Sequence, residues 1–233
     1  MNKAILLVFA HPDDESFGLA GTILKYSRQG VPVDLICATR GEKGTRVDVP
    51  DNVDTGTARE DELRCAAVVT GIRDIYFLGY VDGELNTVPP KQIRDKVMGL
   101  MARLNPEVVI TFGPDGITGH PDHIIIGKAA TQAFESLVRK GKGPGKLYYV
   151  TVPDSAGDEE SGIVTRPDDE VTTTIDINGL QKKKLEALAC HRSQQDARDF
   201  IEMLEEAGES EFAEEYLYLA YPRVSDKETD VFE

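Results

Sequence analysis

Residues 8–18, VFAHPDDESFG, place one histidine and three carboxylates directly behind a short apolar run. Adjacent carboxylates repel one another, and burial would raise their pKa values unless a cation lies among them. A divalent metal ion removes that penalty. His11 and Asp14, three residues apart across a proline turn, could direct an imidazole nitrogen and a carboxylate oxygen toward the same ion. Taken alone, the cluster fits equally well the start of a helix, where Asp13 or Asp14 caps the first turn.

A second cluster, GHPDHIIIG at residues 119–127, also follows an apolar run and opens a predicted helix. Three of the four histidines of the chain lie in the two clusters. We therefore interpret them as one metal site, in which His11, Asp14 and one histidine of the second cluster bind the ion. Three protein ligands leave a position for water and substrate, which is the pattern of a catalytic zinc site. Ferrous iron accepts the same ligands.

The remaining polar residues of the clusters suggest separate roles in catalysis. His120 and His123 are three residues apart at a predicted helix start, so one can bind the metal while the other faces the open position. Asp122 can orient one of these histidines, or it can simply be an acid that favours the helix start. Asp13 lies beside a predicted ligand and is placed to take a proton from the attacking water.

The order of elements predicts an α/β fold with a mostly parallel sheet and helices on both faces, in a single domain over residues 1–233. In such sheets ligands bind beyond the carboxyl ends of the strands, which is where both clusters fall. The dinucleotide-binding version is disfavoured because no G-x-G-x-x-G follows the first strand. Strands are expected at 3–9, 31–38, 74–79, 107–112, 146–152 and 171–177, and helices at 16–29, 58–70, 91–104, 121–139 and over most of 179–220.

Two predicted loops are long for a compact domain, residues 40–56 and residues 153–170. The first follows the second strand, so we expect it to form a lid or a wall facing the substrate. Thr57 is expected to cap the helix that follows, with Glu60 completing a capping box.

Composition limits the partners of the protein. The net charge of −15 over 233 residues argues against nucleic acid or an anionic membrane as partner. No apolar run approaches the roughly 18 residues of a membrane span. Cys37, Cys65 and Cys190 show no CxxC spacing, which predicts reduced, buried thiols in a cytoplasmic protein. Nothing in the sequence decides the oligomeric state, so a homo-oligomer stays open.

The two clusters, AHPDDESFG and GHPDH about 110 residues later, resemble those of the zinc-dependent N-acetylglucosaminyl de-N-acetylase family, the PIG-L or LmbE-like proteins. Weaker similarity extends through TRGEKG, REDEL and HRSQ at residues 39–44, 59–63 and 191–194. The resemblance implies a Rossmann-like fold and hydrolysis of an acetamido group on an N-acetylglucosamine-containing small molecule. It also implies Zn²⁺ bound by His11, Asp14 and His123, with Asp13 as the general base.

The same resemblance implies roles for four further residues. His120 would stabilise the oxyanion and protonate the leaving amine, with Asp122 behind it. Arg59 would contact the sugar or the group attached to it, although a solvated arginine paired with Glu62 is the alternative. Glu42 is a weaker candidate for binding sugar hydroxyls.

Two other functions remain open. A metal-dependent amidase that acts on another acyl-amine, such as a thiol conjugate, would use the same catalytic residues. A non-enzymatic sugar- or metal-binding module is disfavoured because both the base and His120 are present. His191, the fourth histidine, falls on a predicted helix and is assigned no role.

Overall fold

The computed structural model describes residues 3–157, 162–208, 212–222 and 227–233. The chain divides into two compact units, each assembled from separate stretches. Unit 1 comprises Met1–Phe9, Gly83–Ile175 and Tyr216–Glu233, and unit 2 comprises Ala10–Asp82 and Asp176–Glu215. The expected single domain over residues 1–233 stays a prediction.

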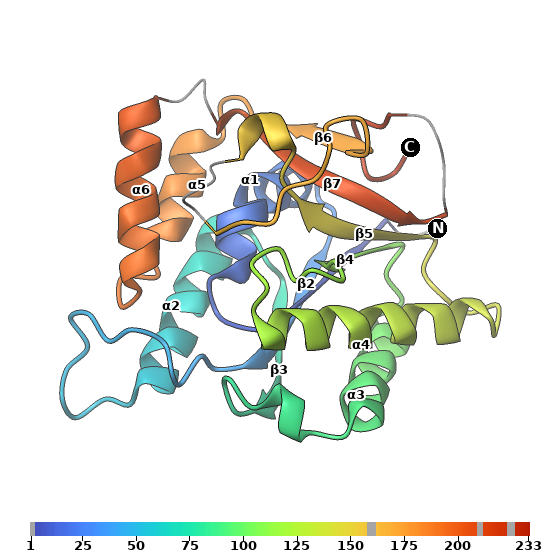
Figure 1. Cartoon of the computed structure of the whole chain (residues 1–233), viewed down its shortest axis with the longest axis horizontal. Coiled ribbons are helices and arrows are strands. Elements are labelled where there is room, and N and C mark those ends of the chain that lie inside the picture. Colours follow the sequence, from blue (N-terminus) through green and yellow to red (C-terminus); the bar gives the residue numbers. More distant parts are fainter. Residues whose placement is uncertain (1–2, 158–161, 209–211, 223–226) are drawn as a thin grey trace. The chain divides into compact units, whose positions relative to one another are not determined.

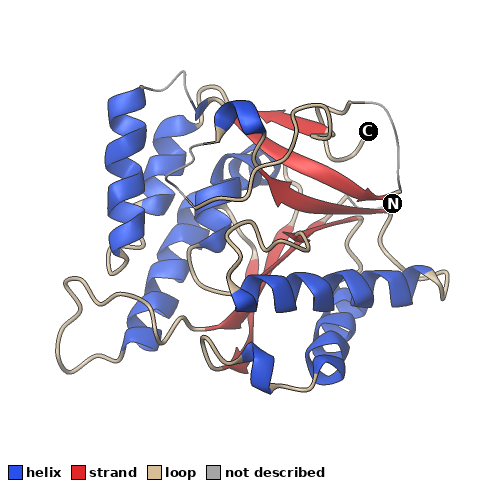
Figure 2. Cartoon of the chain, viewed as in Figure 1, coloured by secondary structure: helices blue, strands red, loops and turns tan. Residues whose placement is uncertain are grey.

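Unit 1 is built on parallel strands. Strand β1 (Ile5–Phe9) pairs with β4 (Val108–Phe112), and β4 pairs with β5 (Lys146–Thr151), in both cases in parallel. The register sets Val8 opposite Thr111. β7 (Glu214–Tyr221) lies antiparallel to β5 (Figure 2), and the short β6 (Thr173–Asp176) follows β7 in the sheet.

The central strands of unit 1 are buried along their whole length, as continuous apolar runs in a parallel sheet should be. Helix α4 (Pro121–Val138) packs against β1 and β4. It also packs against α3 (Pro90–Leu104), as Figure 1 shows. Gly127 permits this approach, because a Cβ at that position would lie 2.4 Å from the carbonyl oxygen of Phe112. α4 therefore begins close to the carboxyl end of β4, which positions the second histidine cluster.

Unit 2 contains the parallel pair β2 (Val33–Thr39) and β3 (Asp74–Tyr80). Helices α1 (Asp14–Arg28) and α2 (Thr55–Thr70) pack against one another and against α5 (Gln181–Leu188). The parallel pairs in the two units, with helices between successive strands along the chain, confirm the predicted α/β class and the mostly parallel strands. No helix in the described part of the chain is long and apolar enough to cross a membrane.

The cap predicted for α2 was wrong. Asp54 is the N-cap, and its carboxylate accepts hydrogen bonds from the backbone N–H and the hydroxyl of Thr57 at 3.0 and 2.5 Å. Thr57 is therefore the residue whose orphan N–H is satisfied, and the helix starts at Thr55.

The prediction of mostly helix over residues 179–220 was wrong in its last third. α5 and α6 (Gln195–Ala207) are helical, but Glu214–Tyr221 forms β7. The apolar residues of EEYLYLAY fit both a helical and an alternating period, and in the structure they alternate between buried and less buried positions. Antiparallel pairing with β5 favours the strand over the helix for this segment.

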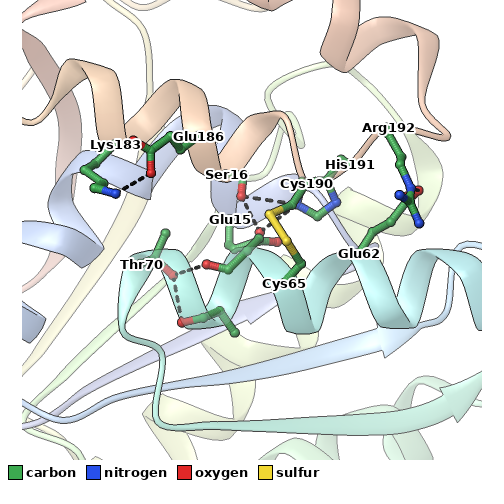
Figure 3. The surroundings of a disulfide bond; sticks show 12 residues. Glu15, Ser16, Glu62, Cys65, Thr70, Lys183, Glu186, Cys190, His191 and Arg192 are labelled. Atoms are coloured by element: carbon green, nitrogen blue, oxygen red, sulfur yellow. Dashed lines mark hydrogen bonds and ion pairs between the residues drawn. A yellow bond between two sulfur atoms is a disulfide. The ribbon is translucent and has the colours of Figure 1, made fainter.

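The prediction of reduced, buried cysteines was wrong for two of the three residues. Cys65 on α2 and Cys190 just after α5, which are 125 positions apart in sequence, form a disulfide (Figure 3). Packing of α2 against α5 brings the two sulfurs together. Cys37 is a buried free thiol, as expected. The thiol argument for a cytoplasmic location no longer holds, because disulfides are typical of oxidising compartments, and the location stays a prediction.

Candidate active site

The turn after β1 brings the first two predicted metal ligands together within unit 2. The Asp14 Oδ2 atom accepts hydrogen bonds from the backbone N–H groups of Ala10 and His11 at 3.0 and 2.8 Å. The Nδ1 atom of His11 lies 4.0 Å from the same oxygen. Asp13, between them, has a φ of 116°, and its carboxylate binds Arg59 instead of these backbone groups. The turn therefore gives two chemically identical neighbours different surroundings.

Asp82 is a site residue that the sequence did not reveal. Its Oδ1 atom lies 3.0 Å from Nε2 of His11, and its Oδ2 accepts the backbone N–H of Lys43 at 2.9 Å. Burial opposes the charge of Asp82, but the hydrogen bond and charge of His11 and the Lys43 N–H outweigh it and lower the pKa to about 2. A carboxylate that holds one imidazole nitrogen fixes the ring and its tautomer, as in many metal sites. In the sequence, Asp82 could have been found only by its position just beyond the carboxyl end of the third strand, β3.

Asp13 lies against Arg59. The guanidinium donates to Asp13 Oδ2 at 2.7 Å, to the Pro12 carbonyl at 2.5 Å and to the Gly41 carbonyl at 3.1 Å. The pKa of Asp13 is raised to about 6. Burial is the main cause of the rise, the charge of Arg59 opposes it, and the charge of Asp14 adds to it. A carboxylate with this pKa can accept a proton near neutral pH.

Arg59 is only 4% exposed, so the alternative of a solvated arginine is wrong. Its expected contact with substrate stays a prediction. The Glu62 carboxylate accepts hydrogen bonds from the backbone and hydroxyl of Ser193, at 2.9 and 2.7 Å. Glu42, the other predicted substrate residue, accepts the backbone N–H of Asp82 at 3.2 Å and keeps a side chain 30% exposed.

The second histidine cluster lies at the start of α4 in unit 1. His120 is the N-cap, and its Nδ1 accepts the backbone N–H of Asp122 at 3.1 Å. His123 Nδ1 lies 3.1 Å from the Gly116 carbonyl, and its ring stacks on Phe112 at a centroid distance of 4.1 Å. In each ring the Nδ1 contact defines the tautomer: Nε2 of His120 carries the proton, and Nε2 of His123 offers the lone pair. Ligand nitrogens of the two histidines lie within 4.8 Å of one another.

Asp122 is fully buried, and both of its carboxylate oxygens are engaged. Oδ2 accepts the backbone N–H of Gly83 at 2.7 Å, and Oδ1 accepts that of Leu85 at 3.2 Å. Asp122 therefore ties the segment after β3 to the start of α4. Its link to His120 runs through its backbone N–H. Catalytic participation of its carboxylate stays a prediction.

The loop over residues 40–56 contains no helix or strand before Thr55 and is fastened at its base. Thr45 donates its hydroxyl to the Ser193 carbonyl at 3.0 Å, and its own carbonyl accepts the Gln194 side-chain amide at 3.0 Å. The HRSQ segment thus supports this loop.

Comparisons with known proteins place the chain among similar sequences and folds. Residues 6–134 match the family model described as PIG-L, GlcNAc-PI de-N-acetylase. A Bacillus anthracis protein named "Probable N-acetyl-alpha-D-glucosaminyl L-malate deacetylase 2" is 35% identical over 195 residues, covering 82% of this chain and 81% of the relative.

Solved structures show the same fold. The N,N'-diacetylchitobiose deacetylase from Pyrococcus horikoshii superposes with a TM-score of 0.69 at 24% identity, covering 93% of this chain and 83% of that one. GalB, the 4-carboxy-2-hydroxymuconate hydratase from Pseudomonas putida KT2440, gives 0.72 at 21% identity, covering 97% and 99%. Two enzymes with different reactions share this fold, so the reaction has to be argued from the site residues.

Proposed function

The chain belongs to the PIG-L family, the GlcNAc-PI de-N-acetylases, and from that premise we propose that it is a metal-dependent hydrolase. It removes the acetyl group from an N-acetylglucosamine-containing small molecule. The observation that carries this proposal is the different surroundings of the neighbours Asp13 and Asp14. The Asp13 carboxylate is held by Arg59 and has its pKa raised to about 6, which suits a base, whereas Asp14 lies 4.0 Å from Nδ1 of His11, which suits a ligand pair.

The metal is held by His11, Asp14 and His123. Contacts of the two histidines support their part in this donor set. Asp82 contacts Nε2 of His11, so Nδ1 would be the nitrogen of this ring that holds the ion. The Gly116 carbonyl contacts Nδ1 of His123, so Nε2 would be the nitrogen of that ring. Two neutral imidazoles with one carboxylate suit zinc, and ferrous iron is the alternative.

The two clusters belong to different units, so their meeting around one ion is part of the proposal. The strands that precede them support it. β1, which leads directly into the HPDDE turn, pairs with β4 in parallel, and their last residues, Phe9 and Phe112, have ring centroids 4.9 Å apart. Phe112 in turn stacks on His123.

The bound metal would supply electrophilic activation, by polarising the amide carbonyl and lowering the pKa of water. Asp13 takes the proton of the water that attacks the carbonyl carbon. His120, whose proton is on Nε2, donates a hydrogen bond to the oxygen that becomes negative. As the C–N bond breaks, the leaving nitrogen takes the proton that Asp13 removed from the water, and the products are acetate and a free amine.

The group attached to the sugar is the open part of the substrate. The family description, GlcNAc-PI de-N-acetylase, and the name of the Bacillus anthracis relative, an N-acetyl-alpha-D-glucosaminyl L-malate deacetylase, give different groups on the sugar. Arg59 and Glu42 remain proposed contacts for the substrate, and an amidase acting on another acyl-amine would need only a different set of pocket residues. A homo-oligomer and a cytoplasmic location are further proposals.

Acetate release from a panel of N-acetylglucosaminyl compounds and other acyl-amines tests this function. The protein is assayed as purified, after chelation, and after reloading with Zn²⁺ or Fe²⁺. We expect activity on at least one N-acetylglucosaminyl compound, its loss on chelation, and about one divalent ion per chain. His11→Ala and His123→Ala should lose the ion. Full metal occupancy in both variants would overturn the ligand assignment, and activity confined to other acyl-amines would overturn the substrate class.

A further inference from the structure

The backbone of Asp13 is in an uncommon conformation. Its φ of 116° lies where residues with a side chain are rarely found. Such conformations persist only when surrounding contacts hold them, and they concentrate at functional sites. The contacts that hold the Asp13 conformation come from Glu15 and the residues packed against it.

Glu15 provides the contact nearest in sequence. Its Oε2 accepts the backbone N–H of Asp13 at 3.2 Å, which closes the turn over Asp14. Its other oxygen accepts the Ser16 hydroxyl at 2.5 Å, and the side chain is fully buried. A buried carboxylate keeps this position only if a partner offsets its charge.

That partner is His191, 176 residues away in sequence. Its Nε2 lies 3.2 Å from Glu15 Oε1 and 3.2 Å from the Ser16 hydroxyl, and the side chain is fully buried (Figure 3). Burial lowers the pKa of His191, but the hydrogen bond and charge of Glu15 outweigh it and raise the pKa. Nδ1 of His191 is buried with no hydrogen-bond partner among the described residues. The polar contacts of this ring are thus directed to Glu15 and Ser16.

The backbone on both sides of His191 is fixed to α2. Cys190 is joined to Cys65 by the disulfide, and Ser193 donates two hydrogen bonds to Glu62. α2 also carries Arg59, which binds the Asp13 carboxylate. The same helix therefore supports Asp13 at its side chain through Arg59 and at its backbone through His191 and Glu15.

We propose that His191 is a positioning residue, which acts through Glu15 to hold the turn at Asp13 in the conformation that the base requires. This inference rests on the proposed role of Asp13 as general base. It gives a function to the histidine of HRSQ, to which the sequence assigned none.

Two variants of His191, to asparagine and to glutamine, test the contact with Glu15, because their side-chain nitrogens extend to different distances from the backbone. The side-chain nitrogen of glutamine occupies nearly the place of a histidine Nε2, whereas that of asparagine occupies the place of Nδ1 and falls short of Glu15. His191→Asn should therefore lower kcat by about 10–100-fold, the usual effect of removing a residue that orients an active-site group. KM and metal content should stay within about twofold, and His191→Gln should recover most of the kcat. Arg192→Ala, which changes a neighbour whose side chain is 78% exposed, is the control and should behave as wild type.

Hydrogen exchange of a peptide covering residues 11–17 provides a second readout that does not need activity. We expect faster exchange in His191→Asn and near wild-type exchange in His191→Gln. If the wild type released no acetate from any compound, the proposed function would fail, and this exchange difference would still decide whether His191 holds the turn.

Three results would overturn the proposal: wild-type kcat in folded His191→Asn, equal losses in the asparagine and glutamine variants, or unchanged exchange at the turn. If His191→Asn does not fold, Glu15→Gln tests the same contact, because it removes the charge of Glu15 and keeps the shape of the side chain. A lower kcat at wild-type metal content would then support the proposal, and an unchanged kcat would overturn it.

Discussion

Arg59 donates a hydrogen bond to the carboxylate of Asp13 at 2.7 Å, and the side chains of the two residues are only 5% and 14% exposed. An arginine so placed does two things. It fixes the orientation of the carboxylate, and its charge opposes the rise in pKa that burial imposes on Asp13. Arg59, the arginine expected at the substrate, thus keeps the pKa of the proposed base below the value that burial without this charge would give.

The first prediction follows from that charge. Asp13 works as a base only when deprotonated, so activity falls as the pH drops below its pKa. Removing the charge in Arg59→Met raises this pKa, which moves the acidic limb of the kcat profile to higher pH. Arg59→Lys, which keeps the charge, should move it less. Arg64→Met, on the exposed part of α2, is the control. An acidic limb at the wild-type pH in Arg59→Met would contradict the coupling.

The loop over residues 40–56 gives a second prediction. Its base is tied to Asp82, Ser193 and Gln194, while its tip, around Asp51 and Asn52, is exposed. Replacing residues 48–52 by a short Gly-Ser turn should raise KM several-fold and leave kcat and metal content near wild type, since the tip touches neither proposed ligand nor base. Steady-state kinetics on the identified substrate, with metal analysis, checks this. An unchanged KM would mean that the tip is only a connector.

The disulfide gives a third prediction, about stability. Cross-linking two residues 125 apart restricts the unfolded chain, so Cys65→Ser should lower the free energy of unfolding by about 2–4 kcal/mol. Urea denaturation with and without reductant measures this. Reductant should destabilise the wild type by a similar amount and leave Cys65→Ser unaffected. A thiol assay verifies that the reductant has opened the disulfide. An unchanged urea midpoint of the wild type after this reduction would contradict the prediction.

The sequence predicted which polar residues lie together within each motif. His11 lies against Asp14 after β1, and His120 lies beside His123 at the start of α4, while their roles as metal ligands or catalytic groups stay predictions. Apolar runs such as ILLVF gave the buried strands, whose boundaries proved correct within about two residues.

What the sequence could not give depends on contacts between distant residues. Asp82 belongs to no motif and gains its role only when His11 lies against it. Glu15 and His191 are 176 residues apart, and the disulfide cysteines 125 apart, so both pairs needed the packing of α1 and α2 against α5. β7 was misassigned because its apolar residues fit two periods and only the neighbouring β5 selects one.

Metal content and turnover of Asp13→Asn and Asp14→Asn, measured side by side at saturating substrate, test the central claim most directly. Asp14 contributes charge and an oxygen to the ion, so Asp14→Asn should lose both metal and activity. Asp13 accepts the proton and does not hold the metal, so Asp13→Asn should keep the ion while kcat falls by roughly 10²–10⁴-fold. An empty site in Asp13→Asn with a filled one in Asp14→Asn would reverse the two roles. Normal metal content and turnover in both variants would contradict the hydrolase mechanism itself.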